Sequence, residues 1–255
     1  MTNLPTYVDE QKLFGRRGFQ ALDWQCRELL DDANGDLFTG GGRALEIGAG
    51  EGLMSLWMLH AGARAVTSLE PESSGSTSGV GARAEAHRRA LGIPEERWDY
   101  RADTLQSFSG GPYRVILSYA SVNHLDEAAC VKLLEDPQAR ATYVEIFRKI
   151  RDMLEPGGSF IVADAARENY WAKLGRPSPW SPEVEWHKHQ EPETWSRLLA
   201  EAGLEPISQR WFFPYYRARR LRPLLDNKVA ARCLDSTFVI RARRPLGDRD
   251  ARPAT

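Results

Sequence analysis

The sequence lacks the features that mark membrane-spanning, secreted and metal-binding proteins. None of its apolar runs approaches the ~18 residues that a membrane-spanning helix needs. The N-terminal residues include charges at Asp9, Glu10 and Lys12, and they contain no apolar signal-peptide region. Cysteine is scarce and odd in number, without metal-ligand spacing: Cys26, Cys130 and Cys233. We therefore expect a cytoplasmic protein with reduced thiols.

The sequence also lacks an excess of either charge. Its 34 Lys and Arg residues and 35 Asp and Glu residues leave a formal net charge of −1, so no global field attracts it to nucleic acid or to a membrane. No internal repeat is apparent. What is present is 255 residues with 42% hydrophobic side chains, enough for one or two globular domains.

The most informative stretch is Arg43–Gly52, which reads Arg-Ala-Leu-Glu-Ile-Gly-Ala-Gly-Glu-Gly. It predicts a short buried strand that breaks into glycines and then enters a helix over Leu53–Ala61. Gly48, Gly50 and Gly52 allow a tight turn and the close approach of a ligand to the backbone. The following helix would direct free N–H groups toward that ligand. The stretch therefore predicts a nucleotide-like cofactor at the end of the first strand of an α/β sheet.

The glycine spacing bears on which cofactor is bound. The dinucleotide fingerprint is G-x-G-x-x-G, whereas here the glycines fall as G-x-G-x-G and Leu53 takes the third position, which disfavours NAD. Glu46 is an unusual residue for a buried strand and would suit a cationic or amino-bearing ligand. Leu-Glu-Ile-Gly-Ala-Gly-Glu-Gly resembles the first motif of the class I S-adenosylmethionine (SAM) dependent methyltransferases. The resemblance implies SAM as cofactor, held by Glu46, Gly48, Ala49, Gly50 and Gly52.

The remaining elements fit the same resemblance. Apolar and β-branched runs predict further strands over residues 65–69, 98–102, 113–119, 159–163, 204–213 and 236–242. Helical periodicity predicts helices over 82–91, 138–154 and 192–202, the second of them stopped by Glu155-Pro156-Gly157-Gly158. The resemblance then implies an α/β fold. We expect a Rossmann-like, doubly wound, mostly parallel seven-stranded sheet with its last strand antiparallel and helices on both faces.

Polar residues follow several of the predicted strands. Glu70 lies 18 residues after Gly52, about where a ribose-binding carboxylate is expected, and a carboxylate can accept both hydroxyl hydrogens of a ribose diol. The resemblance implies that Asp103 contacts the adenine amino group, although Asp is also an ordinary turn residue after a strand. Four neighbours complete the predicted cofactor site: Pro71, Thr104, Ser118 and Tyr119.

The candidate catalytic residues are histidines. Methyl transfer is an in-line displacement in which positioning supplies much of the rate, and a base is needed only where the acceptor must lose a proton. His124 follows the fourth predicted strand, where the resemblance places Asn123 and His124 beside the transferred methyl. Glu185, His187 and His189 alternate, so an extended segment would point them to one side. We name His124, His187 and His189 as catalytic candidates and assign no metal; a structural, hydrogen-bonded role stays open for each.

Three regions are expected along the chain. Residues 1–40 predict a helical cap, with Tyr7, Phe14 and Phe19 as candidate lid residues, and residues 41–245 predict the methyltransferase domain. Residues 165–191, rich in aromatics and prolines, predict an inserted segment that covers the substrate. Residues 246–255 predict a disordered tail. A basic cluster is read as a solvated helix face or a site for an acidic group: Arg217, Arg219, Arg220 and Arg222.

Together these features predict a SAM-dependent methyltransferase that methylates oxygen or nitrogen of a small-molecule acceptor. The aromatic insert favours a ring-bearing or partly apolar acceptor. An Asn-Pro-Pro-Tyr type motif is absent, and Ser118–Val122 stands in its place, which disfavours nucleic acid. Two alternatives remain at this point: an NAD-dependent oxidoreductase, and a protein of the same fold that binds SAM without methyl transfer.

Overall fold

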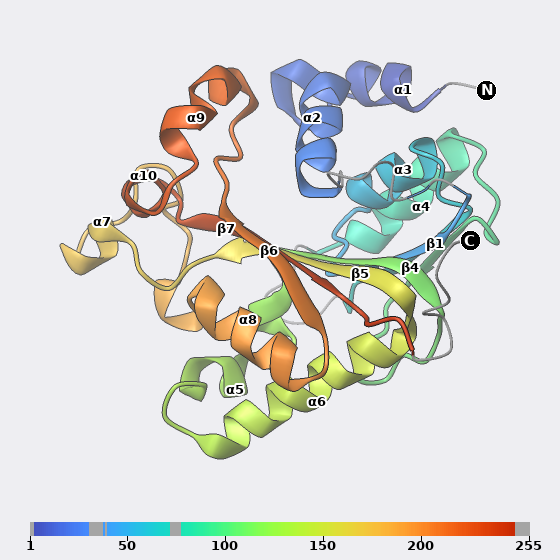
Figure 1. The fold of residues 1–255 in the computed structure, drawn as a ribbon. Helices are drawn as coiled ribbons and strands as arrows, with labels where there is room; N and C mark the ends of the chain where they lie inside the picture. The colour runs from blue at the N-terminus through green and yellow to red at the C-terminus, as the bar shows by residue number, and fades with distance from the viewer. Residues whose placement is uncertain (1–2, 31–37, 39, 72–77, 248–255) are drawn as a thin grey trace, which may run out of the picture. The chain divides into compact units, whose positions relative to one another are not determined.

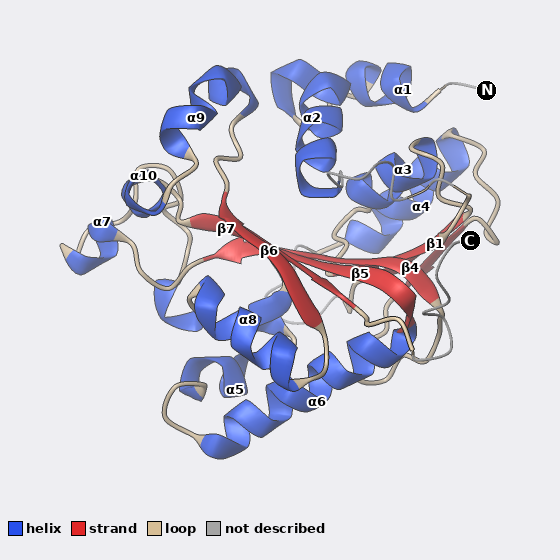
Figure 2. Cartoon of the chain, viewed as in Figure 1, coloured by secondary structure: helices blue, strands red, loops and turns tan. Residues whose placement is uncertain are grey.

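The computed structural model describes residues 3–30, 38, 40–71 and 78–247 of the chain. Its strands form one seven-stranded sheet in the order β3-β2-β1-β4-β5-β7-β6 (Figures 1 and 2). The strands are β1 (Arg43–Ile47), β2 (Ala65–Leu69), β3 (Trp98–Arg101), β4 (Tyr113–Tyr119), β5 (Leu154–Ala165), β6 (Glu205–Trp211) and β7 (Thr237–Arg243). Strand β7 runs antiparallel to both β5 and β6. The predicted fold class is confirmed.

The chain divides into two compact units, residues 1–119 and 120–255. The predicted division into a cap over 1–40, a domain over 41–245 and a tail stays a prediction. Residues 31–37 and 39 of the predicted cap lie outside the described residues, as do residues 248–255 of the predicted tail. None of the helices that the structure describes is both long and apolar enough to cross a membrane.

The first unit is built on parallel strands. Strand β1 pairs with β2 and β4, and β2 pairs with β3, with Ala44 opposite both Val66 and Val115. Residues 115–117 of β4 are fully buried, as expected for a strand covered on both faces. Four helices belong to this unit: α1 (Leu4–Glu10), α2 (Gly18–Leu30), α3 (Leu53–His60) and α4 (Val80–Ala90). Helix α3 packs on β1 and β2, and α4 packs on β3 (Figure 1).

The N-terminal helices form where the apolar spacing predicts them. Asn3 caps α1 by accepting a hydrogen bond from the backbone N–H of Thr6 at 3.0 Å, and Pro occupies the first turn. In α2 the periodic apolar residues are buried, among them Leu22, Cys26 and Leu29. Tyr7 is buried on α1, so it is a packing residue of this unit.

The second unit is built on the antiparallel strands β5, β7 and β6. Its helices are α5 (Glu127–Lys132), α6 (Pro137–Met153), α7 (Tyr170–Lys173), α8 (Pro192–Glu201), α9 (Arg222–Leu225) and α10 (Lys228–Cys233). Helices α5, α6 and α8 lie together (Figure 2). Trp195 of α8 contacts Tyr143 and Phe147 of α6, with ring centroids 5.0 and 5.9 Å apart, and Phe147 contacts Phe160 of β5. This aromatic cluster joins the two helices to the sheet.

Two segments differ from the sequence prediction. Strand β5 begins at Leu154, directly after α6, and includes the Pro-Gly-Gly segment that was expected only to stop the helix. The reason is tertiary, because Gly157 N donates to Arg244 O and Arg244 N donates to Gly158 O, each at 2.9 Å. The segment between β6 and β7 holds a 3-10 helix (Tyr216–Leu221), α9 and α10. The sequence anticipates a helix here only through the basic cluster of residues 217–222, read as a solvated helix face or as a site for an acidic group, and it gives no bounds for any of the three.

Candidate functional site

The glycine turn after β1 adopts a backbone conformation that favours glycine at three positions. Gly48, Gly50 and Gly52 have φ angles of +72°, +52° and +81°. The backbone N–H groups of Gly48 and Ala49 both donate to Leu69 O, at 2.9 and 3.1 Å, and so fix the turn to the end of β2. These two amides shape the turn, and the predicted contact of Gly48 and Ala49 with a cofactor stays a prediction.

Two of the glycines serve different purposes. A Cβ at Gly52 would lie 2.2 Å from Cζ2 of Trp98, so glycine is required there for packing against β3. A Cβ at Gly50 would meet nothing within 4 Å, so the space over this part of the turn is open. Tyr100 donates its hydroxyl to Gly50 O at 2.6 Å, which ties the turn to β3. The turn is therefore fixed in shape and leaves room for a ligand at Gly50.

Glu70 is bound to the glycine turn. Its side chain is buried, and its Oε2 accepts a hydrogen bond from Gly50 N at 2.8 Å. Among the described residues, its Oε1 has no partner. A carboxylate that is anchored through one oxygen and open at the other fits the predicted role of accepting hydrogen bonds from a ribose diol. The residues present thus fit SAM.

The other predicted cofactor residues occupy the ends of β2, β3 and β4. Asp103 is half-buried, and its Oδ2 lies 3.6 Å from Nη1 of Arg101. Thr104 begins a turn in which Ser107 N donates to its Oγ1 at 3.2 Å. Pro71 follows Glu70 and is half-buried, as is Tyr119 at the end of β4, whereas Ser118 is fully buried. Their contacts with a cofactor stay predictions.

Glu46 lies in a buried polar chain beneath the turn. Ser55 of α3 donates its hydroxyl to Glu46 Oε2, Ser55 Oγ lies 2.6 Å from Ser68 Oγ, and Trp98 Nε1 donates to Ser68 Oγ at 2.8 Å. Burial raises the pKa of Glu46 to about 8, and the bonds from Ser55 oppose that shift. The carboxyl is therefore mostly protonated at neutral pH, and a nearby positive charge would favour its ionised form. The predicted contact with a cationic ligand stays a prediction.

In the second unit the structure pairs a predicted histidine with a carboxylate that the sequence did not single out. Asp164, near the carboxyl end of β5, places its Oδ2 3.2 Å from Nδ1 of His189. The two side chains are only 1% and 12% exposed. An ionised Asp164 would only accept hydrogen bonds, so in that pairing His189 would donate through Nδ1–H and its Nε2 would be left as an acceptor. Nε2 has no partner among the described residues and is not among the atoms that are sealed in the interior.

His124 has a carboxylate partner of another kind. Its Nδ1 lies 3.1 Å from Oε2 of Glu127, and both side chains are substantially exposed. Lys188 also binds Glu127, with Nζ 2.6 Å from Oε1. The bond from Lys188 is the largest cause that lowers the pKa of Glu127. The carboxylate beside His124 is therefore already paired with a lysine.

The predicted alignment of Glu185, His187 and His189 is wrong. Residues 186–188 form a 3-10 helix in which Lys188 N donates to Glu185 O at 2.8 Å, so the segment is not extended and alternate side chains do not share one side. His187 is exposed, and its backbone carbonyl accepts a hydrogen bond from Arg167. In the described part of the chain, no three His, Cys, Asp or Glu side chains are grouped to hold a metal ion.

Buried contacts position the segment that carries His189. Gln190 donates its Nε2 to Cys130 O at 2.6 Å, and Cys130 donates its thiol to Lys188 O at 3.2 Å. Tyr143 donates its hydroxyl toward Asn123 O at 3.1 Å, which fixes the turn before α5. Burial raises the pKa of Cys130 to about 12, so this cysteine stays a thiol and acts as a packing residue.

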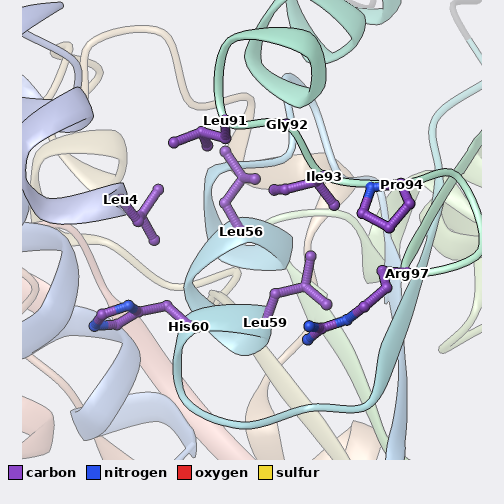
Figure 3. A pocket seen from close by; sticks show the side chains of 9 residues that line it. All are labelled: Leu4, Leu56, Leu59, His60, Leu91, Gly92, Ile93, Pro94 and Arg97. Carbon is purple, nitrogen blue, oxygen red and sulfur yellow. The ribbon is translucent and has the colours of Figure 1, made fainter. Parts of the chain in front are cut away.

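A separate cavity of about 270 Å³ lies in the first unit, between α1, α3 and the segment after α4 (Figure 3). Its lining is mainly aliphatic, and His60 and Arg97 contribute an imidazole and a guanidinium group. None of the predicted cofactor or catalytic residues lines it. Arg97 uses its Nε and Nη2 to donate to the carbonyls of Arg64 and Ala63. This cavity is distinct from the candidate site.

Comparison with known proteins agrees with the glycine turn and the sheet order. Residues 21–209 match the family described as "Methyltransferase domain". A protein of Ruegeria pomeroyi named "Ubiquinone biosynthesis O-methyltransferase" is 30% identical over 204 residues, which cover 75% of this chain and 73% of that protein.

Two solved structures share the fold. One, an S-adenosylmethionine dependent methyltransferase from Mesorhizobium loti, has a TM-score of 0.57 and 18% identity over 88% of this chain and 98% of that one. The other, a geranyl diphosphate C-methyltransferase from Streptomyces coelicolor with S-adenosyl-L-homocysteine bound, has a TM-score of 0.59 and 15% identity over 93% and 80% of the two chains. The match over most of the chain, the glycine turn with its anchored Glu70 and the antiparallel β7 agree: the chain belongs to the SAM-dependent methyltransferases and uses SAM as its cofactor.

Proposed function

We propose that the protein transfers the methyl group of SAM to the oxygen of a ring hydroxyl on a small-molecule acceptor, with His189 as general base. The observation that carries this proposal is the Asp164–His189 pair, with its Nδ1–Oδ2 distance of 3.2 Å and its low exposure. The name of the Ruegeria pomeroyi relative, an O-methyltransferase, supports oxygen as the acceptor atom. NAD chemistry has no such support.

The histidine pair favours oxygen over nitrogen for a chemical reason. A neutral amine attacks with its own lone pair and loses its proton afterwards, whereas a hydroxyl becomes a strong nucleophile only as its proton is removed. His189 would take that proton at Nε2, and Asp164 would stabilise the imidazolium through Nδ1–H. A base of this kind is therefore useful chiefly for an oxygen acceptor.

The residues that would hold the cofactor are in the first unit. Glu70 would bind the ribose hydroxyls, Asp103 the adenine amino group, and Gly50 would leave the backbone open for close approach. When bound, SAM supplies an electrophilic methyl group on a sulfonium centre. The chain's own contribution is to align the acceptor oxygen and to receive its proton.

Aromatic side chains of the inserted segment support a ring-bearing acceptor. Trp180 is 48% exposed and Tyr170 is 37% exposed, both large apolar side chains at the surface of the second unit. Trp180 packs on Tyr215 with ring centroids 5.6 Å apart, and Tyr215 donates its hydroxyl to Trp180 O at 3.0 Å. Stacking surfaces of this kind suit planar rings. Residence in the cytoplasm stays a prediction from cysteine usage.

The test measures methyl transfer from isotope-labelled SAM to catechol and to 3,4-dihydroxybenzoate. The wild type should give a product that is heavier by one methyl group on oxygen. His189→Asn should lower kcat by about 10²–10⁴-fold, the range that a general base contributes. Its affinity for S-adenosylhomocysteine, measured by calorimetry, should stay within about twofold.

His124→Asn and His187→Asn are the matched controls, because both histidines are exposed and neither is paired with a buried carboxylate. The carboxylate beside His124, Glu127, is shared with Lys188. Both variants should keep near-wild-type kcat. Full activity in His189→Asn, or a loss of activity in His124→Asn alone, would show that His189 is not the base. An N-methylated product from an aminophenol at a higher rate than the O-methylated one would overturn the choice of oxygen.

A further inference from the structure

Arg167 has a half-buried guanidinium near the Asp164–His189 pair, and among the described residues no acidic side chain forms an ion pair with it. It follows Asp164 by three residues, and its Nη1 donates to the backbone carbonyl of His187 at 3.2 Å, two residues before the proposed base. In the described part of the chain, its Nε and Nη2 have no hydrogen-bond partner. They are not sealed in the interior either. The Nε–Nη2 edge of this guanidinium is thus available to a ligand.

The carboxylates around Arg167 are already bound by other cations. Lys188 binds Glu127 and Glu185, with Nζ–O distances of 2.6 and 2.7 Å. Arg232 binds Glu168 at 2.7 Å and Glu191 at 3.0 Å. Each of these carboxylates therefore has a cation of its own, and within the described ranges none of them is paired with Arg167. Asp164 in turn is bound by His189.

Arg167 and Asp164 both act on the same buried group, the thiol of Cys130 in α5. Among the charges that act on the Cys130 thiol, Asp164 raises its pKa and Arg167 lowers it. Both charges therefore lie near α5, and Arg167 joins the carbonyl of His187 in the segment that leads to His189. A ligand that places a hydroxyl at His189 would therefore meet the Nε–Nη2 edge of Arg167 in the same part of the second unit.

We propose that Arg167 is a specificity-determining residue that binds a carboxylate on the acceptor, so that the substrates are ring hydroxyl compounds that also carry an acidic group. The two N–H groups on the open edge match the two oxygens of a carboxylate, and such charge-assisted, bidentate bonds are strong and directional. This inference rests on the proposed O-methylation. It adds the substrate class, because it states which acceptors the site selects.

The experiment compares two acceptors that differ by one group, 3,4-dihydroxybenzoate and catechol, at saturating SAM. For the wild type, kcat/KM should be at least tenfold higher with 3,4-dihydroxybenzoate than with catechol. Arg167→Gln should raise KM for 3,4-dihydroxybenzoate by at least tenfold, with kcat within about twofold, and leave both constants for catechol unchanged. Arg167→Lys keeps the charge without the bidentate edge and should recover part of the loss.

Arg176→Gln is the matched control, since Arg176 is an exposed arginine of the same unit. It should leave all constants at wild-type values, and the catechol reaction of Arg167→Gln verifies that this variant is folded. Equal use of both acceptors by the wild type overturns the proposal. Equal loss for both acceptors in Arg167→Gln also overturns it, because that result marks a structural role.

A binding measurement separates this inference from the proposed function. Calorimetry would follow the binding of 3,4-dihydroxybenzoate to the protein with S-adenosylhomocysteine bound. The wild type could fail to methylate either probe while binding of 3,4-dihydroxybenzoate weakens at least tenfold in Arg167→Gln. That result would reject the two tested acceptors and uphold Arg167 as the carboxylate site. Binding that is the same in both proteins would reject Arg167, whatever the activity.

Discussion

Replacement of Glu46 by glutamine should change how the stability of the protein depends on pH. The carboxyl is buried in the chain of hydrogen bonds through Ser55 and Ser68, and burial raises its pKa from the ordinary value of 4.5 to about 8. Between these two values the folded protein keeps the proton and the unfolded chain releases it. The free energy of unfolding therefore falls as pH rises through this window, and below pH 4.5 both states are protonated.

The size of the effect follows from the two pKa values. Each pH unit in the window changes the free energy of unfolding by roughly 1.4 kcal/mol, so the whole window amounts to about 5 kcal/mol. Glu46→Gln removes the titration and keeps the shape of the side chain. The difference in stability between the variant and the wild type should therefore increase in favour of the variant from pH 5 to pH 8.

The assay is urea unfolding of both proteins, followed by tryptophan fluorescence at pH 5, 6, 7 and 8. Other groups titrate equally in the two proteins, so their contributions cancel in the difference. A constant difference across this range would refute the reasoning, because it would mean that Glu46 has the same pKa in the folded and unfolded states.

Two further substitutions probe the first unit. Gly52→Ala places a Cβ 2.2 Å from Cζ2 of Trp98 at a φ of +81°, and it should lower the free energy of unfolding by about 2–4 kcal/mol in urea titrations. Gly50→Ala has open space around its Cβ and should cost only about 1 kcal/mol, so equal losses would contradict the packing argument. Tyr7→Phe removes the 2.8 Å hydrogen bond from α1 to Nδ1 of His87, whose Nε2 has no hydrogen bond among the described residues. The substitution should cost about 1–3 kcal/mol in the same measurement, and an unchanged midpoint would show that this bond is not needed.

The sequence predicts those elements whose ends are marked locally. Strands β2 and β4 fall on the predicted residues, because each is a short apolar run with an abrupt polar or proline boundary. Helix α6 begins within one residue of its prediction, with Asp136 as cap and Pro137 in the first turn. Strand β5 is longer than predicted, since Gly157 and Gly158 exchange backbone hydrogen bonds with Arg244, the residue just after β7, which local pattern does not reveal.

The irregular segments of the second unit could not be predicted for the same reason. Asn169 donates to Leu234 O at 3.0 Å, and Trp171 donates its Nε1 to Cys233 O at 2.8 Å, more than 60 residues away along the chain. Contacts at this separation decide the path of both segments. A reading that relies on periodicity within a window of about 18 residues has no access to them.

The choice among the three candidate histidines depends on the same kind of long-range information. His124 and His189 each have a carboxylate within 3.2 Å, so distance alone does not separate them. The two carboxylates differ in exposure and in their other partners. The side chain of Glu127 is 43% exposed and also binds Lys188, whereas the side chain of Asp164 is almost fully buried and is paired with His189. A buried carboxylate stabilises an imidazolium more than an exposed and already paired one, since screening by water is weaker. The partner of the histidine, 25 residues away along the chain, is therefore the observation that supports His189 over His124 as the proposed base.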